Sequence, residues 1–384
     1  MRFFFTGYIF LLSFSGLAKA AEAIVSIQKH TQHHQWAGES YFHRQITFEN
    51  TLGPEKDGKK IHQIHFHELY QDRELRSEVG YFFVPGSIAN FESFFILKEK
   101  SLPALLLRSG AQVFGISPLT RPSSHPCSSQ MVCPELKFWG MKEYVEDIHF
   151  LIQQIKMNHP RMKKIIFVGY SLGAMVGEVY ASHFPKSIDG MVLIDGTLVS
   201  KDPRFIRTME GLCQQGQKMS DQMGQVPEKQ VYLTMIPISK DMTNDQKKKV
   251  ANILTHPLPS FLWPFIYLSP DNKKTFLHSK WEPLIEYFEI GNPMTAGKLF
   301  LDYSCKDRIA ELTKNVAQFE APLLSIESSG GFNGLMSDFV NQTNSKSLAT
   351  ESLLNNVGHF DLLFGEKVQN TLALMIHAWE KSTP

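Results

Sequence analysis

Short apolar runs alternate with amphipathic segments over much of the chain, and this alternation predicts most of its secondary structure. Residues 138–158 and 172–182 place apolar positions every three or four residues, which is the period of a helix covered on one side. The apolar runs between them have strand length and are apolar at nearly every position: YFFVPG, AQVFGISP, KKIIFVG and IDGMVLID. Alternation of this kind predicts an α/β protein whose mostly parallel sheet is covered by helices on both faces.

The alternation of strands and helices is absent before about residue 81 and is interrupted after Asp195. Residues 24–81 read as extended segments, QITFEN and IHQIHFHELYQD, separated by the polar turn GPEKDGKK. After Asp195 the alternation gives way to helical stretches and the aromatic run PSFLWPFIYLSP, and it resumes at APLLSI, with SLATESLLNN as a further strand and a closing helix. We predict core segments at residues 21–195 and 321–384 and a mainly helical cap inserted at 196–320. An independent domain is the alternative, but the sheet pattern continues beyond it.

The N-terminus has the features of a secretory signal peptide. Arg2 precedes an apolar stretch over residues 3–17, and Ala18-Lys19-Ala20 provides small residues around a cleavage site. We expect residues 1–20 to be removed and the protein to be exported, either periplasmic or secreted. An uncleaved anchor is the alternative, but the apolar stretch is short and no later one would span a bilayer.

Composition argues against nucleic-acid binding and allows two disulfides. With 384 residues, 43% hydrophobic positions and a net charge of +1, the chain resembles an ordinary globular protein without the basic surface of a nucleic-acid binder. Export makes its four cysteines candidates for disulfides. Cys127 and Cys133 flank a short loop and form the pair that spacing favours, which leaves Cys213 with Cys305. The sequence does not indicate the oligomeric state.

Histidines are concentrated near the N-terminus. His65 and His67 share one face of a predicted strand, and three others, His30, His33 and His34, precede them. A metal site is conceivable there, but two histidines at this spacing are more typical of a solvated strand face, and no paired-cysteine metal motif is present.

One serine lies at a strand-to-helix junction. The segment GYSLG at residues 169–173 fits G-x-S-x-G, follows the apolar strand KKIIFVG and begins a helical pattern. Glycines at 169 and 173 leave room for the tight turn, and the start of the helix offers free N–H groups to an anion. Ser171 is therefore a candidate nucleophile. A serine that only caps the helix is the alternative.

A nucleophilic serine needs a base and a site for the oxyanion. NNVGHFDLLFG places His359 after an extended segment and before the closing helix, whereas the other candidates, His149, His183 and His377, lie in or at the end of helical patterns. We expect the oxyanion donors to be the backbone N–H of Leu172 and that of Ser87, which follows the turn at Pro85-Gly86.

The order of these motifs resembles the α/β-hydrolase superfamily in its esterase and lipase branch. The resemblance rests on the order of five features: FFVPGS, FVGYSLG, VLIDG, a long insert and GHFD. It covers about residues 81–381. It implies a serine, acid and histidine triad in that chain order. Relatives often have His-Gly in the oxyanion loop where this chain has Pro85, and Ser171 excludes the branches with an aspartate nucleophile.

The acid departs from the family pattern. Relatives usually place an aspartate in a turn after the strand that follows the cap, but residues 327–333 read ESSGGFN. Three carboxylates compete: Asp195 at the end of the strand after the nucleophile helix, Glu327 at the end of the later strand, and Asp338 in a predicted helix. Some lipases carry the acid at the position of Asp195, but relatives also use an aspartate there to tie loops together.

The resemblance implies hydrolysis of a carboxylic ester. Ser171, activated by His359, would form an acyl-enzyme without a metal or organic cofactor. Aromatic residues in the cap suggest a small-molecule or lipid-like ester with an apolar portion, and the alternative is that they only form the core of the cap. The same triad also serves peptidases and acyltransferases. A catalytically inactive hydrolase fold used for binding is a further alternative.

Overall fold

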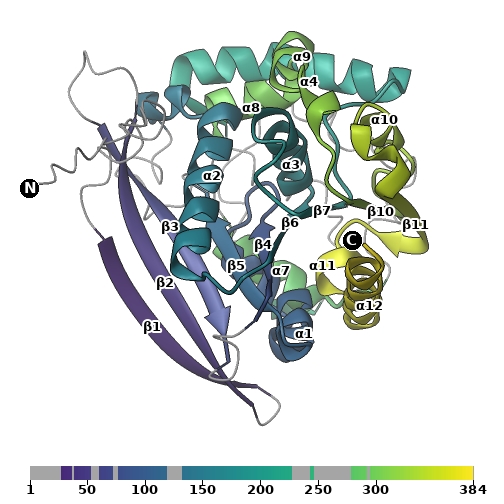
Figure 1. The fold of residues 1–384 in the computed structure, drawn as a ribbon. Helices are drawn as coiled ribbons and strands as arrows, with labels where there is room; N and C mark the ends of the chain where they lie inside the picture. The colour runs from purple at the N-terminus through teal and green to yellow at the C-terminus, as the bar shows by residue number, and fades with distance from the viewer. Residues whose placement is uncertain are drawn as a thin grey trace, which may run out of the picture.

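A nine-stranded sheet forms the centre of the protein (Figure 1). The computed structural model describes residues 27–36, 39–52, 60–71, 77–118, 132–226, 243–245, 278–291 and 295–383. Across the sheet the strand order is β1-β2-β3-β5-β4-β6-β7-β10-β11. The strand bounds are β1 Ile27–Trp36, β2 Glu39–Leu52, β3 Lys60–Tyr70, β4 Val79–Val84, β5 Gln112–Ser117, β6 Lys164–Tyr170, β7 Gly190–Ile194, β10 Leu323–Gly330 and β11 Ala349–Gly358.

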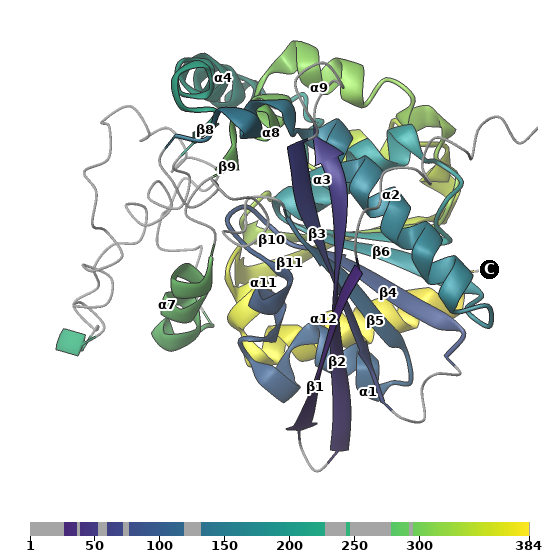
Figure 2. The ribbon, with the colours of Figure 1, turned by 90° about the vertical axis from the view of Figure 1, so that its left-hand side faces the viewer.

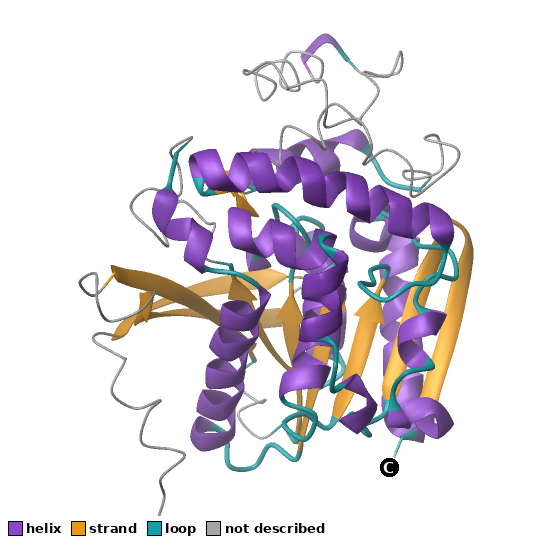
Figure 3. Ribbon diagram, turned by 90° about the horizontal axis from the view of Figure 1, so that it is seen from above, coloured by secondary structure: helices purple, strands orange, loops and turns teal. Residues whose placement is uncertain are grey.

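The sheet has a parallel part and an antiparallel part. All neighbouring pairs from β5 through β11 are parallel, whereas β1, β2, β3 and β5 pair antiparallel. Figure 3 shows the long N-terminal strands projecting to one side of the molecule. The prediction of a mostly parallel sheet that begins with extended N-terminal segments is confirmed.

Two apolar cores cover the two faces of the sheet. On β4 the buried side chains alternate, since Phe82 and Val84 belong to one core while Tyr81 and Phe83 belong to the other. The helices α2 Met141–Asn158 and α3 Leu172–His183 pack in the first core. The helices α1 Leu102–Arg108, α11 Asp361–Phe364 and α12 Glu366–Ser382 pack in the second. This burial on both faces explains why the strands are apolar at almost every position.

Pro103 lies at the start of α1, after two short 3₁₀ turns. Residues 91–95 and 98–100 form the 3₁₀ turns η2 and η3, and α1 starts at Leu102 with Pro103 in its first turn. Proline is favoured at this position because the first N–H groups of a helix have no partner within the helix. Pro103 therefore starts the helix rather than breaking it.

Helices dominate the described part of the segment between β7 and β10. They are α4 Pro203–Met223, α7 Trp281–Ile290, α8 Gly297–Ser304 and α9 Lys306–Leu312. The short strands β8 Gln225–Val226 and β9 Thr295–Ala296 pair with each other. Figure 2 shows α7 standing apart from α4, α8 and α9. The helical character agrees with the prediction, while the cap boundaries at 196 and 320 stay a prediction and the aromatic run at 259–270 lies outside the described residues.

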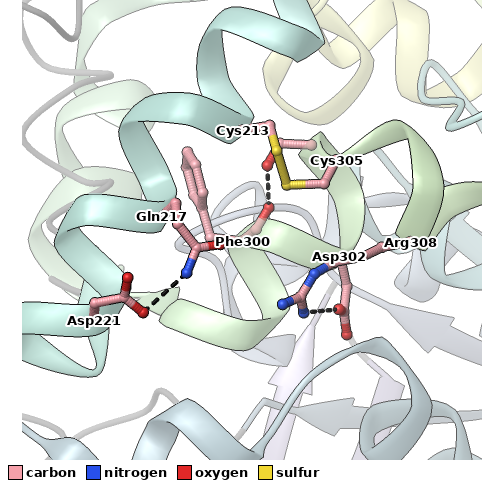
Figure 4. Close-up of a disulfide and its surroundings, with 8 residues drawn as sticks. Cys213, Gln217, Asp221, Phe300, Asp302, Cys305 and Arg308 are labelled. Atoms are coloured by element: carbon pink, nitrogen blue, oxygen red, sulfur yellow. Dashed lines mark hydrogen bonds and ion pairs between the residues drawn. A yellow bond between two sulfur atoms is a disulfide. The ribbon is translucent and has the colours of Figure 1, made fainter.

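A disulfide joins the two ends of this segment. Cys213 on α4 is bonded to Cys305, which lies between α8 and α9, 92 residues later in the chain (Figure 4). The expected Cys213–Cys305 pair is thus present. Cys133 is also disulfide-bonded, but Cys127 lies outside the described residues. Beside the disulfide, Arg308 donates to Asp302 at 2.8 Å, which adds an ionic contact at the same end of α8.

Loss of the Cys213–Cys305 disulfide is expected to destabilise the fold. The double variant Cys213→Ser/Cys305→Ser frees a long loop in the unfolded chain, and a cross-link of this kind typically contributes about 2–4 kcal/mol. Urea unfolding followed by circular dichroism would measure the change. The double variant in the presence of a reductant is the control, because the reductant should then have less effect than it has on the wild type. Equal stability of wild type and variant would contradict the prediction.

The histidine-rich strands do not present the solvated face that their spacing suggested. His65 and His67 are buried, and His67 lies 2.9 Å from a ring nitrogen of His43 and 2.9 Å from the Ser117 hydroxyl. The prediction was wrong because packing covers this face of β3, where His67 stacks on Phe91 of η2 with ring centroids 4.7 Å apart. In the ranges that the structure describes, no group of three or more histidine, cysteine or acidic side chains could hold a metal ion.

The predicted signal peptide at residues 1–20 lies outside the described residues. Among the helices that the structure does describe, none combines the length and the apolar character needed to cross a membrane.

Candidate active site

Ser171 lies in a strained turn between β6 and α3. Its backbone has φ 54°, a value that residues other than glycine rarely adopt. A Cβ at position 169 would lie 2.2 Å from the Gly173 carbonyl oxygen, and one at 173 would lie 2.0 Å from that of Val84. Both glycines are therefore required by the close approach of the backbone. The hydroxyl of Ser171 makes no capping bond to α3, so the helix-cap alternative is not what the structure shows.

His359 follows β11 and reaches Ser171 from the other end of the sequence. Its Nε2 lies 3.1 Å from Ser171 Oγ, which is hydrogen-bond distance. Tyr170 supports the imidazole, because the two rings stack with centroids 4.9 Å apart and the Tyr170 hydroxyl donates to the His359 carbonyl at 3.0 Å. The histidine is thus held by its ring and its backbone.

Asp195 contacts the second nitrogen of His359. The residue follows β7 directly, and its Oδ2 lies 2.7 Å from His359 Nδ1. Its side chain is fully buried, but the carboxylate also accepts the Ser328 N–H at 2.8 Å, the Ser328 hydroxyl at 2.7 Å and the Phe332 N–H at 3.1 Å. These bonds offset the cost of burying a charge. Ser171, His359 and Asp195 form one continuous hydrogen-bonded chain.

The two other candidate acids bind backbone away from His359. The carboxylate of Glu327 accepts the N–H groups of Gly334 and Met336, and burial raises its pKa. Asp338 on the short helix α10 Ser337–Val340 accepts the N–H of Lys201 at 2.6 Å. Of the three carboxylates that the sequence left open, the structure brings only Asp195 to the histidine.

The end of β10 and the turn after it support Asp195. Ser328, near the end of β10, and Phe332, in the turn after it, both donate to Asp195. A Cβ at Gly331 would lie 1.9 Å from Asp195 Oδ2, so this glycine lets the turn approach the carboxylate. Ser328 is not among the candidate residues that the sequence indicates. A pair of serines followed by two glycines, in place of the expected aspartate, is the signal for it.

The two expected oxyanion donors flank Ser171. Leu172 is the first residue of α3, and a Cβ at Gly86 would lie 3.1 Å from Ser171 Cβ, which places the loop after β4 beside the serine. Ser87 is buried in this loop, and its carbonyl accepts the Tyr287 hydroxyl at 2.9 Å. Ile88 has φ 58°, a strained value for a β-branched residue. Neither Tyr287 nor this strain has a local signal in the sequence.

Glu178 supports the turn that follows Asp195. This fully buried residue of α3 accepts the Thr197 hydroxyl at 2.5 Å and the Leu198 N–H at 2.8 Å. Burial raises its pKa to about 8, which the hydrogen bonds to Thr197 and Leu198 only partly counteract. A glutamate inside the apolar helix sequence GAMVGEVYA was the signal for it.

The raised pKa of Glu178 predicts a loss of stability as the pH rises. The folded state favours the protonated acid, so its contribution is complete below the unfolded pKa of about 4.5 and is lost as the pH approaches 8. Glu178→Gln should remove this dependence, and the wild type should lose a few kcal/mol more than the variant between pH 5 and pH 8. Urea unfolding at both pH values measures it, with the exposed Glu311→Gln as control. Identical pH slopes for Glu178→Gln and wild type would contradict the prediction.

Comparison with known proteins agrees with this architecture. A family model described as the alpha/beta hydrolase fold matches residues 82–265. A structure from work on carboxylesterases of the thaumarchaeon Nitrososphaera gargenis is 12% identical with a TM-score of 0.51, covering 86% of this chain and 100% of that one. No curated protein matches the chain by sequence.

Two yeast structures share the fold over most of their length. The peroxisomal α/β-hydrolase Lpx1 from Saccharomyces cerevisiae is 10% identical with a TM-score of 0.54, over 94% of this chain and 91% of that one. A soluble variant of monoglyceride lipase from the same organism is 11% identical with a TM-score of 0.51, over 93% and 96%. The shared sheet architecture shows that this chain has the α/β-hydrolase fold, and the matching family model supports its place in the α/β-hydrolase superfamily.

Proposed function

We propose that the protein is a serine hydrolase that cleaves carboxylic esters through an acyl-enzyme on Ser171. The observation that carries the proposal is the hydrogen-bonded chain from Ser171 Oγ through His359 to Asp195 at the end of the sheet. A serine hydroxyl becomes a good nucleophile only when a base takes its proton, and this arrangement supplies the base together with a buried carboxylate behind it.

The first half of the reaction would form the acyl-enzyme. Ser171 Oγ attacks the ester carbonyl carbon while His359 Nε2 takes the hydroxyl proton, and the imidazolium that forms is stabilised by Asp195. The backbone N–H groups of Leu172 and Ser87 are the proposed donors to the oxyanion. When the intermediate collapses, the bond to the alcohol oxygen breaks, and His359 gives its proton to the departing alkoxide.

The second half would release the acid. His359 takes a proton from water as the water oxygen attacks the acyl carbon, and it returns that proton to Ser171 Oγ as the acyl–oxygen bond breaks. Every proton is accounted for by one imidazole. The cycle therefore requires no metal or organic cofactor.

Aromatic rings around the histidine support an apolar portion in the substrate. Phe360 and Phe332 have ring centroids 5.6 Å and 6.2 Å from that of His359. Apolar walls with a few polar groups are typical of small-molecule sites. The structural neighbours with the same fold include a structure from work on carboxylesterases and a monoglyceride lipase. Ester cleavage by this chain would agree with the activities that these names state.

Export of the mature protein after residue 20 is part of the proposal. The Cys213–Cys305 disulfide supports it, since disulfides persist mainly in oxidising compartments. The insert at 196–320 is proposed as the cap over the site. Neither peptidase nor acyltransferase activity has a feature among the described residues that favours it over ester hydrolysis.

A panel of p-nitrophenyl esters with acyl chains of increasing length tests the proposal. We expect hydrolysis of at least the shorter esters, and labelling by an alkyl fluorophosphonate that peptide mapping assigns to Ser171. The panel should include thioesters and peptide amides. An absence of hydrolysis with every one of these substrates would overturn the proposed function, and cleavage of peptides alone would replace it with a peptidase.

A further inference from the structure

Helix α7, together with the residues just before it, contacts two of the loops that carry proposed catalytic groups. It belongs to the segment between β7 and β10, yet it lies apart from α4, α8 and α9 and close to the loops after β4 and β11 (Figure 2). On one side it reaches Ser87, the proposed oxyanion donor. On the other side, the residues just before it reach the loop that holds His359.

A buried carboxylate fixes the start of α7 to the histidine loop. Asp361 Oδ1 accepts the His278 N–H at 2.7 Å and the Ser279 hydroxyl at 2.8 Å, while its Oδ2 accepts the Gly358 N–H at 2.9 Å. Asp361 is fully buried, so these bonds replace the water that a charged group would otherwise bind. His278 Nε2 also donates to the Asn356 carbonyl at 2.6 Å. The helix therefore starts from an anchored point.

Apolar packing fixes the middle of α7 to the same loop. Tyr287 makes edge contacts with Phe360 and Phe364, with ring centroids 6.0 Å and 5.4 Å apart, and Phe288 lies 6.3 Å from Phe360. Tyr287 and Phe288 are both buried. The ring contacts of the Tyr287 side chain therefore fix the position of its hydroxyl.

Both peptide planes beside Ser87 are held by hydrogen bonds. The plane between Gly86 and Ser87, which contains the Ser87 N–H, has its carbonyl bonded to the Ala89 N–H at 3.2 Å. The plane between Ser87 and Ile88 has its carbonyl bonded to the Tyr287 hydroxyl at 2.9 Å. The next residue, Ile88, has φ 58°, and a strained conformation of this kind persists only where surrounding contacts impose it.

We propose that Tyr287 is a positioning residue that holds the Ser87 amide in the direction of the oxyanion. Without its hydroxyl, the plane after Ser87 loses the bond that opposes relaxation of the strained turn. The Ser87 N–H would then point less accurately at the charge that develops in the transition state. This inference rests on the proposed esterase function, and it makes α7 a component of the oxyanion site.

The variant Tyr287→Phe tests the inference, because it removes the hydroxyl and keeps the ring. Loss of a complete oxyanion donor costs about 10²–10³ in kcat, so a misdirected donor should cost roughly tenfold. We expect kcat for a p-nitrophenyl ester to fall by this factor with KM nearly unchanged. Affinity for an alkyl boronic acid, which mimics the tetrahedral intermediate, should weaken by a similar factor, while the pH profile keeps its shape because His359 is untouched.

Tyr144→Phe is the matched control. Its hydroxyl on α2 is also buried and has no hydrogen-bond partner among the described residues, so its removal should leave kcat and boronic acid affinity at wild-type values. Thermal unfolding of both variants checks that the fold is kept. An active wild type with unchanged kcat in Tyr287→Phe would overturn the role of Tyr287 alone. A rise in KM without a fall in kcat would also overturn it, and an inactive wild type would overturn the esterase function as well.

Discussion

Ser171→Ala is expected to lower kcat for a p-nitrophenyl ester by about 10⁴-fold or more, since loss of a serine nucleophile can cost ~10⁶ in kcat. Alanine keeps the Cβ of the strained turn, so the change removes the nucleophilic oxygen and little else. The hydrogen bond to His359 Nε2 at 3.1 Å is lost with it. Steady-state hydrolysis and fluorophosphonate labelling of wild type and variant measure the effect.

Ser109→Ala is a suitable control for this experiment. Its hydroxyl bonds the Leu106 carbonyl at the end of α1 and has no place in the proposed chemistry, so activity should stay at the wild-type level. Fold integrity of Ser171→Ala can be checked by thermal unfolding. If this variant kept a substantial share of the wild-type turnover, a different nucleophile would have to be sought.

Asp195→Asn is expected to lower kcat by about 10⁴-fold, which is the cost of the equivalent change in a serine, histidine and aspartate triad. The amide can donate toward His359 Nδ1, so the histidine is driven into the tautomer that cannot take the Ser171 proton. The imidazolium also loses the buried negative charge beside it. Single-turnover and steady-state ester hydrolysis would separate this loss from an effect on binding.

Glu327→Gln provides the decisive comparison for the acid. Its carboxylate binds the N–H groups of Gly334 and Met336, so the change should weaken that loop and reduce activity by about tenfold at most. Asp338→Asn should have a still smaller effect on turnover. If Asp195→Asn kept near-normal turnover and Glu327→Gln lost most of it, Glu327 and not Asp195 would be the acid.

Much of the fold could be predicted because its signals are local. Strands β4, β6 and β7 are buried on both faces and therefore appear in the sequence as unbroken apolar runs. The turn at Ser171 could also be predicted, because its glycines, its strand and its helix are neighbours in the chain. The prediction for His65 and His67 failed because the spacing of side chains along a strand does not reveal what will pack against each face of the sheet.

The acid could not be chosen from the sequence, since the choice depends on which strand ends become neighbours. Asp195 and Ser328 meet only because β7 and β10 pair in the sheet. Tyr287 and Ser87 are likewise separated by 200 positions. Contacts of this kind leave no periodic pattern, so they become visible only when the chain has folded.

The pairing of β7 with β10 makes the segment between them modular. It leaves the sheet and returns to it at adjacent strands, and the Cys213–Cys305 bond closes it near its two ends. The register of the sheet is therefore independent of how many residues lie between those cysteines, and the entropy of closing a loop grows only slowly with its length. Such a segment can be lengthened, shortened or exchanged while Ser171, Asp195 and His359 keep their places, but an exchange that removes α7 must replace the support it gives to Ser87.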